Sequence, residues 1–306
     1  MINPAPTRRS VITSCGLLAL SACLAKAPAP KIDPFAVKLL ELEQRSGGRL
    51  GVYILDSATG RAIGQRANER FGMCSTFKLA LAAALLQRSD AGLLDLETFI
   101  PYTKVDLLPV SPVTQENLSK GGMTIAALAE ATQITSDNAA ANLLLKQLGG
   151  PAALTQIFRS WGDAITRLDR YEPEMNLVPA GELRDTTTPM AFAKTMAKIL
   201  TTDSILKPIS RDKLNTWMVD TKTGVKRIRA GLPPAWKSGD KTGTGAHKGY
   251  TNKTNDTAIF WPQGKPPIIV TCYYEGPVIS DDIRDADQAV LTEVGRIAAQ
   301  WAETLR

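Results

Sequence analysis

The feature that most constrains this chain is a lysine placed one helical turn after a serine, where a strongly apolar helix begins. Residues 76–86 are apolar on nearly every side, which predicts a helix buried all round. Ser75 lies at its start and Lys78 three positions later, so both share one helical face. A buried, unpaired lysine is costly. Lys78 therefore either snorkels toward water or is a desolvated base that shares a proton with Ser75 and a carboxylate.

The same Ser-x-x-Lys spacing recurs three times, at residues 204–207, 210–213 and 238–241. Lys207 precedes Pro208, which disfavours helix there. Ser210 is predicted to be a helix N-cap, and Ser238 enters a predicted strand. Only Ser75 opens a long buried helix, whose N-terminal amides and dipole favour developing negative charge.

Two further polar segments stand beside predicted elements. Ser136-Asp137-Asn138 lies between two predicted helices, where Asp137 is a candidate N-cap. Lys241-Thr242-Gly243 begins a predicted strand that continues through Thr244-Gly245, and its glycine permits close approach to the backbone. A second Lys-Thr-Gly, at residues 222–224, is predicted to be loop.

Composition excludes several kinds of chemistry. The chain has 306 residues and a single histidine, His247, so it offers no histidine cluster for zinc. A Ser-His-Asp triad would depend on His247 alone, so serine chemistry here needs a lysine or a carboxylate as its base. The net charge of +6 is scattered among acids, which argues against nucleic-acid binding.

Residues 167–176, Arg-Leu-Asp-Arg-Tyr-Glu-Pro-Glu-Met-Asn, are too polar and too marked by proline for a regular element. A charged surface loop is the plain interpretation. The segment ends near Arg184-Asp185, and we predict that Arg170 and Asp185 pair across its neck.

Together these segments resemble class A serine β-lactamases. The Ser-x-x-Lys, Ser-Asp-Asn and Lys-Thr-Gly set is shared with penicillin-binding proteins, whereas residues 167–176 resemble the Ω-loop with which class A enzymes hydrolyse their own acyl-enzyme. The resemblance covers nearly the whole chain after about residue 33. It implies hydrolysis of the β-lactam amide bond through a serine acyl-enzyme, with deacylation by a glutamate-activated water and without metal or organic cofactor.

The resemblance also implies roles for individual residues. Ser75 attacks the lactam carbonyl, and the backbone N–H groups of Ser75 and Thr244 form the oxyanion hole. Lys78, or Glu172 through a water, takes the serine proton, a choice disputed for the family. Ser136 delivers a proton to the leaving nitrogen. The residues implied in substrate binding are Asn138, Asn176, Lys241, Thr242, Gly243, Thr244 and Arg227.

The chain departs from many relatives at Arg227 and at the rim of the site. Many carry a second cation for the substrate carboxylate on the strand after Lys-Thr-Gly, but no arginine follows Lys241 until Arg284. Arg227 is therefore expected to take that role, with Arg229 as the next candidate. Val110 stands where many relatives have an aromatic gate, and residues 246–254, which include His247, are longer than the usual hairpin. The choice among penicillins, cephalosporins and carbapenems stays open.

Two of the four cysteines lie in the body of the chain. In some carbapenem-hydrolysing relatives the cysteine matching Cys74 is bridged to one after the Lys-Thr-Gly strand, but here that position is Gly245. Cys272 is predicted to pack in a buried strand.

Strands near both ends of the chain, with helices between them, predict an α/β lobe against an all-helical lobe. The expected sheet is antiparallel and flanked by helices. We assign residues 34–68 and 220–306 to the α/β lobe, and 69–219, including the Ω-loop 167–185, to the helical lobe. Residues 1–23 read as an export signal with a candidate lipidation site at Cys23, followed by a linker over 24–33. We expect a periplasmic monomer, either free or anchored by lipid.

Two alternatives share the three motifs. A DD-peptidase or penicillin-binding protein lacks the hydrolytic loop, and a non-catalytic penicillin-sensing module would need a receptor context.

Overall fold

The strands predicted near both ends of the chain form one antiparallel sheet of five strands. The computed structural model describes residues 1–2 and 33–305, and the following account concerns the compact unit Asp33–Arg306. The strands are β1 (Arg49–Asp56), β2 (Ala62–Gln65), β7 (Lys237–Gly245), β8 (Lys253–Trp261) and β9 (Ile268–Glu275). Their order is β2-β1-β9-β8-β7, so β7 occupies one edge.

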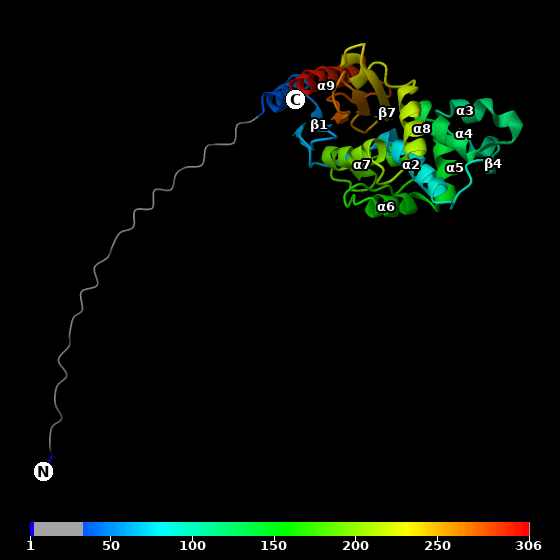
Figure 1. The fold of residues 1–306 in the computed structure, drawn as a ribbon, viewed down its shortest axis with the longest axis horizontal. Helices are drawn as coiled ribbons and strands as arrows, with labels where there is room; N and C mark the ends of the chain where they lie inside the picture. The colour runs from blue at the N-terminus through cyan, green and yellow to red at the C-terminus, as the bar shows by residue number, and fades with distance from the viewer. Residues whose placement is uncertain (3–32, 306) are drawn as a thin grey trace. The chain divides into compact units, whose positions relative to one another are not determined.

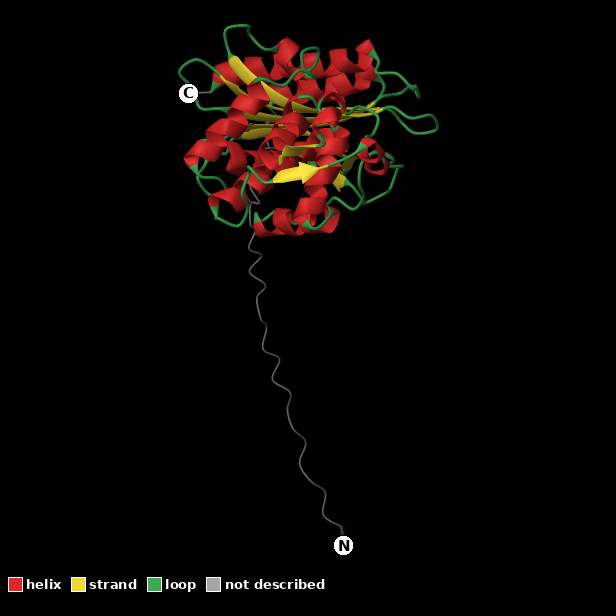
Figure 2. Cartoon of the chain, turned by 90° about the vertical axis from the view of Figure 1, so that its right-hand side faces the viewer, coloured by secondary structure: helices red, strands yellow, loops and turns green. Residues whose placement is uncertain are grey.

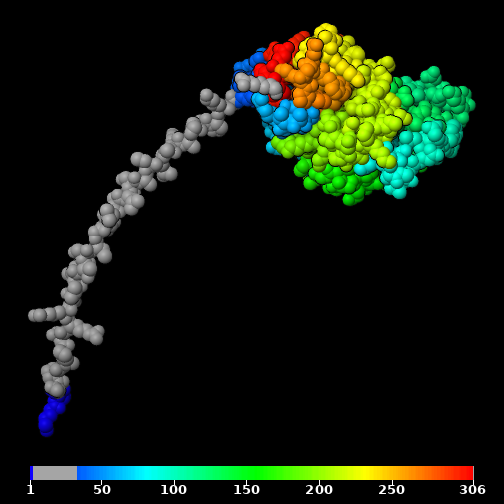
Figure 3. Space-filling model, viewed as in Figure 1, coloured from blue at the N-terminus to red at the C-terminus, as the bar shows by residue number. Residues whose placement is uncertain are grey.

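Each face of this sheet carries its own apolar core, because neighbouring side chains on a strand point to opposite faces. Ile54 belongs to the cluster under α1 (Pro34–Ser46) and α9 (Asp285–Thr304). The next residue, Leu55, belongs to the cluster that includes α7 (Pro189–Thr201) and the helical region. Figure 2 shows the strands lying between these helices. The space-filling view shows the blue and red ends of this unit, α1 and α9, packed together (Figure 3).

The remaining helices form the helical region (Figure 1). They are α2 (Phe77–Asp90), α3 (Pro112–Glu116), α4 (Ile125–Ile134), α5 (Asn138–Leu148), α6 (Pro151–Ser160) and α8 (Pro208–Val219). The buried α2 packs against α4, α5, α6 and α8, and α3 packs against α4. Two short strand pairs accompany them: β3 (Phe71–Gly72) with β6 (Thr186–Thr187), and β4 (Phe99–Pro101) with β5 (Gly122–Thr124). This arrangement confirms the predicted class, an antiparallel sheet flanked by helices with an inserted helical region.

Local signals set several helix ends, and the cap predicted at Asp137 is among them. Asp33 caps α1 by accepting a hydrogen bond from the Phe35 amide at 2.8 Å. Asp137 caps α5 through the Ala140 amide at 2.9 Å. The prediction for Ser210 was wrong: α8 begins at Pro208, with Lys207 as its N-cap. Proline fits a first helical position because a backbone N–H, which proline lacks, would have no intrahelical partner there.

Nearly all of the predicted export signal, including Cys23, and most of the linker 24–33 lie outside the described residues. Within the described part, no helix is long and apolar enough to cross a membrane.

Candidate active site

Ser75 lies in a single 3-10 turn, Cys74–Thr76, that leads directly into α2. The preceding residue, Cys74, is buried with a positive φ of 46°, so the chain turns sharply before the serine. The Ser75 hydroxyl donates a hydrogen bond to Glu172 Oε1 at 3.0 Å. The serine and the loop glutamate are therefore in direct contact, although 97 positions separate them.

Lys78 has no exposed side-chain surface, so it does not snorkel to water. Its Nζ lies 3.0 Å from Glu172 Oε1 and donates hydrogen bonds to the Ser136 carbonyl at 2.8 Å and to Asn138 Oδ1. Burial lowers the pKa of the Lys78 amine, and the charge of Glu172 opposes that shift. A buried amine with a lowered pKa is suited to accept a proton at neutral pH.

Glu172 is held from both sides. Its Oε2 accepts a hydrogen bond from Asn176 Nδ2 at 2.6 Å, and the residue is only 2% exposed. Asn142 on α5 fixes its backbone, because its Oδ1 accepts from the Glu172 amide at 3.0 Å and its Nδ2 donates to the Glu172 carbonyl at 2.8 Å. Glu174, the competing carboxylate, is exposed.

Asn142 was not predicted from the sequence. One signal was present: Asn142 follows Asn138 by four positions, so both lie on one face of α5. This face therefore meets both the Lys78 amine and the Glu172 backbone.

Ser136 and Lys241 meet on the other side of the site. The Lys241 amine donates to Ser136 Oγ at 3.0 Å and to the Thr242 carbonyl at 2.8 Å. Its side chain is fully buried, and burial together with the like charge of Lys78 lowers the pKa of Lys241 well below its usual range. Ser136 therefore has a lysine on each side, since Lys78 Nζ lies 3.5 Å from the same hydroxyl.

The edge strand β7 presents Thr242 and Thr244 to the site. The two hydroxyls of Thr242 and Thr223 lie 2.7 Å apart. Arg227 Nη2 donates to Thr244 Oγ1 at 2.7 Å, and its Nη1 donates to the carbonyls of Gly243 and Asn255. Arg227 is 3% exposed, so it is no solvated surface arginine.

Thr223 is a second residue that the sequence did not reveal. It belongs to the Lys-Thr-Gly copy predicted as loop, and the structure places it outside regular elements but against the functional copy. Gly243 also has a structural reason to be glycine: a Cβ there would lie 2.6 Å from the Met73 carbonyl oxygen, so β7 could not approach the turn that carries Ser75.

These residues surround a cavity of about 420 Å³. Its lining comprises Ser75, Val110, Thr135, Ser136, Asn138, Asn176, Thr223, Arg227, Thr242, Thr244, Ala246, Ile283 and Gln288. Val110 is 66% exposed and has a positive φ of 60°, rare for a β-branched residue. His247 does not line the cavity and packs edge-on against Tyr250. A larger cavity of about 510 Å³ lies elsewhere, lined by residues of β1 and α7 among others.

Both cysteines of the described part, Cys74 and Cys272, are buried and free. Burial raises the pKa of the Cys74 thiol to about 12, so it stays protonated. A Cβ built on Gly245 would lie 3.1 Å from Cys74 Sγ. Gly245 therefore occupies the place from which a cysteine would reach Cys74, in agreement with the position expected from the sequence.

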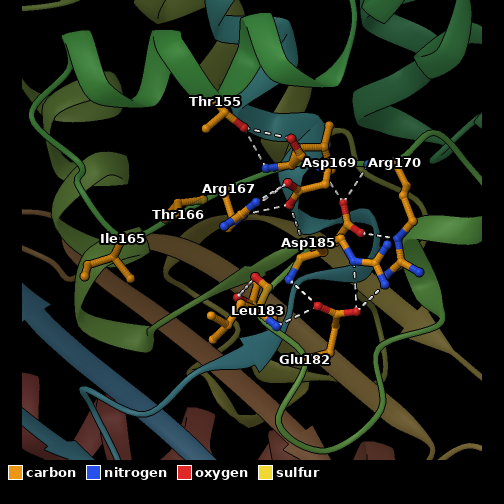
Figure 4. A network of polar contacts seen from close by, with 12 residues as sticks. Thr155, Ile165, Thr166, Arg167, Asp169, Arg170, Glu182, Leu183 and Asp185 are labelled. Carbon is orange, nitrogen blue, oxygen red and sulfur yellow. Dashed lines mark hydrogen bonds and ion pairs between the residues drawn. The ribbon is translucent and has the colours of Figure 1, made fainter.

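An ion pair closes the neck of the loop that carries Glu172 (Figure 4). Arg170 Nε lies 2.6 Å from Asp185 Oδ2, and Asp185 Oδ1 accepts from the backbone amides of Asp169 and Arg170. The Asp185 side chain is fully buried at this crossing. Asp185 also has a positive φ of 59°, a conformation that aspartate and asparagine tolerate better than most residues.

Asp185→Asn is expected to lower stability by roughly 1–3 kcal/mol, the range for hydrogen bonds to a charged group. Asparagine keeps the shape and the tolerance of positive φ, so the loss isolates the charge. The loosened loop should also weaken turnover of good substrates and admit bulkier ones. Thermal unfolding and a substrate panel measure both effects. Glu182→Gln, which removes an ion pair on the same loop, is the matched control. A wild-type melting temperature and substrate profile for Asp185→Asn would contradict the prediction.

The sheet, the helical region and the serine–lysine–glutamate contacts define a serine hydrolase of the β-lactamase type. The model of the β-lactamase enzyme family matches residues 34–302. The carbapenem-hydrolyzing β-lactamase KPC of Klebsiella oxytoca is 44% identical over 96% of this chain and 96% of its own length. β-Lactamase L2 of Stenotrophomonas maltophilia is 43% identical over 90% of this chain and 88% of its own.

Solved structures agree. An ancestral class A β-lactamase has a TM-score of 0.82 at 54% identity, covering 87% of this chain and 99% of that one. A β-lactamase from Burkholderia vietnamiensis has a TM-score of 0.84 at 45% identity, covering 90% and 98%. The chain belongs to the β-lactamase enzyme family, class A. It hydrolyses the β-lactam amide bond by the serine mechanism general to that family, as the sequence predicted and in preference to the two alternatives.

Proposed function

We propose that Ser75 is the nucleophile, with Lys78 and Glu172 as its proton acceptors. The observation that carries this proposal is that one oxygen, Glu172 Oε1, contacts both Ser75 Oγ and Lys78 Nζ at 3.0 Å. A serine attacks a lactam carbonyl only as its proton leaves, and here the proton has a direct path to the carboxylate and onward to the amine. The backbone amides of Ser75 and Thr244 stabilise the oxyanion.

In the second half of acylation, Ser136 protonates the leaving nitrogen. Lys241, 3.0 Å from the Ser136 hydroxyl, and Lys78, 3.5 Å from it, favour loss of that proton and its replacement from the buried amines. The ring C–N bond breaks, and the substrate stays attached to Ser75 as an ester.

Deacylation requires a water between the ester and a base. Glu172 is that base and Asn176 orients the water, because Asn176 donates to Glu172 while its Oδ1 is buried and accepts no hydrogen bond from the described residues. Asn138 binds the substrate's side-chain amide. Nitrocefin tests the whole scheme: continuous turnover that Ser75→Ala abolishes supports it, and turnover that persists in Ser75→Ala refutes Ser75 as nucleophile.

The carboxylate of the substrate binds at β7, between Lys241, Thr242 and Thr244, with Gly243 allowing close approach. Arg227 supplies the second positive charge. Its contact with Thr244 Oγ1 at 2.7 Å supports this role, because it reaches the subsite from the loop before residues 228–231.

Arg227→Ala is expected to raise KM about tenfold or more while kcat falls less, since a charge that binds the substrate and transition state alike acts mainly on KM. Steady-state kinetics with benzylpenicillin measures the split, and thermal unfolding reports loss of the contacts to Gly243 and Asn255. Lys226→Ala removes an adjacent, 65% exposed cation and is the matched control. An unchanged KM in Arg227→Ala would transfer the role to Arg229.

Class A β-lactamases are generally exported. We propose that this chain acts as a periplasmic monomer and that Cys23 carries a lipid anchor, supported by the Leu20-Ser21-Ala22-Cys23 sequence after an apolar stretch. Fractionation of cells expressing the full chain and its Cys23→Ala variant tests the anchor. Release of the variant alone from the membrane fraction supports lipidation, and identical distributions refute it.

A further inference from the structure

A cavity of about 510 Å³ is bordered by β1, α7 and residues 162–165. Of the residues that the structure describes, none lines both this cavity and the one around Ser75. Tyr53 and Leu55 alternate along β1, so both side chains lie on the sheet face that carries α7. The lining positions 191, 194, 195 and 198 of α7 recur at intervals of three or four and therefore share one helical face. The volume lies in the range of small-molecule sites, roughly 300–1,000 Å³.

The wall of this cavity is largely apolar, and its two acids are already engaged. The apolar side chains are those of Leu55, Ala164, Ile165, Met190, Ala191 and Ala197. Asp56 is 2% exposed and accepts hydrogen bonds from the Ala58 amide at 3.0 Å and the Thr59 hydroxyl at 2.5 Å. Asp163 is 6% exposed and accepts from the Thr195 hydroxyl of α7 at 3.0 Å, besides three groups of its own turn.

Two donors on this wall remain without a partner. Burial raises the pKa of Tyr53, so its hydroxyl keeps its proton and can donate a hydrogen bond. Lys194 lies on the cavity face of α7 and is exposed, so its ammonium group can reach a ligand at the mouth. Within residues 33–305, neither the Tyr53 hydroxyl nor the Lys194 amine makes a hydrogen bond or an ion pair. The free polar groups are therefore suited to a ligand that accepts hydrogen bonds and carries negative charge.

We propose that this cavity is a second ligand site, which binds an amphipathic carboxylate with Tyr53 and Lys194 as its donors. The apolar body of the ligand packs between the β1 and α7 walls and removes apolar surface from water, which is the main source of affinity. The carboxylate stays at the mouth, where Lys194 is solvated. This placement keeps the charge of the ligand away from the engaged acids, Asp56 and Asp163.

A ligand in this cavity also contacts the chain on both sides of the Ω-loop neck. Residues 163–165 precede the neck and Thr188 follows it, and all of them line the cavity. The two sides are joined beside the cavity, because the hydroxyls of Thr166 and Thr187 lie 2.6 Å apart. A ligand that binds only when these walls are in place stabilises them by mass action. Occupation should therefore slow local opening of the neck.

Calorimetric titration with 2-naphthoate tests the site on the full chain, with methyl 2-naphthoate as the uncharged counterpart. Lys194→Gln should weaken binding of 2-naphthoate about twofold to fivefold, the effect expected for an exposed ion pair, and leave binding of the ester unchanged. Lys213→Gln removes an exposed lysine of α8 and is the matched control. Failure of the wild type to bind 2-naphthoate, or equal affinities of wild type and Lys194→Gln, would overturn the proposal.

Ala191→Phe fills the cavity without a change of charge and should abolish binding of both probes, while benzylpenicillin turnover without a probe stays at the wild-type rate. Saturating 2-naphthoate should leave the KM for benzylpenicillin unchanged and slow hydrogen exchange at residues 163–167 and 185–188. Purely competitive inhibition that persists in Ala191→Phe would place the probe at the substrate-carboxylate subsite and refute the second site. Because every readout except turnover is a binding measurement, failure of the proposed roles of Ser75 and Glu172 would not imitate any of these results.

Discussion

Glu172→Ala is expected to stop the enzyme as a covalent adduct on Ser75. An acyl-serine ester persists in water unless a positioned base activates the attacking water, and removal of a general base costs roughly 10²–10⁴-fold in rate. Glu172 contacts Ser75 on one oxygen and Asn176 on the other, so the variant loses both the base and the group that Asn176 holds. Lys78 remains as a buried amine with a lowered pKa, so acylation continues.

Intact mass spectrometry after mixing with benzylpenicillin measures the adduct, and steady-state kinetics measures the loss of turnover. Glu174→Ala, two positions away and exposed, is the matched control and should turn over as wild type. Wild-type turnover in Glu172→Ala would show that another group activates the water, and the hydrolytic scheme would then be wrong.

The sequence predicted those parts of the site whose chemistry lies within one short segment. Ser-x-x-Lys and Lys-Thr-Gly both recur in this chain, so the motif alone did not identify Ser75 or Lys241. The element around each copy decided the choice, since only one serine opens a buried helix and only one Lys-Thr-Gly lies on a strand. Arg170 and Asp185 were predictable for a related reason, because opposite charges flanked a segment with no regular pattern.

Contacts made by residues outside the motifs were not predictable in this way. Asn142 holds the Glu172 backbone from a helix 30 positions earlier. Its spacing from Asn138 puts it on the same face of α5, but nothing in either segment predicts that this face meets the backbone of Glu172. Tyr53 and Lys194 line one cavity only because α7 packs on β1, and their positions in the sequence do not specify that contact. Thr223 was not predicted to lie at the site because its Lys-Thr-Gly copy does not belong to a strand.

Lys78→Ala is expected to block acylation, the step before the deacylation that Glu172→Ala blocks. Loss of the amine leaves the Glu172 carboxylate buried and unpaired, and breaking a buried ion pair typically costs about 3–5 kcal/mol. Ser75 also loses the amine that its proton reaches by way of Glu172. Acylation should therefore fall by roughly 10²–10⁴-fold.

The two variants should differ in the species that accumulates. Rapid mixing with benzylpenicillin followed by mass spectrometry should find unmodified Lys78→Ala at times when Glu172→Ala is fully acylated. Lys146→Ala removes an exposed lysine of α5 and controls for the loss of a positive charge. Rapid acylation of Lys78→Ala would mean that Glu172 alone deprotonates Ser75 and that Lys78 serves only to keep that carboxylate ionised. If Lys78→Ala is acylated slowly but the adduct that forms is hydrolysed at the normal rate, the Lys78 amine acts in the first proton transfer.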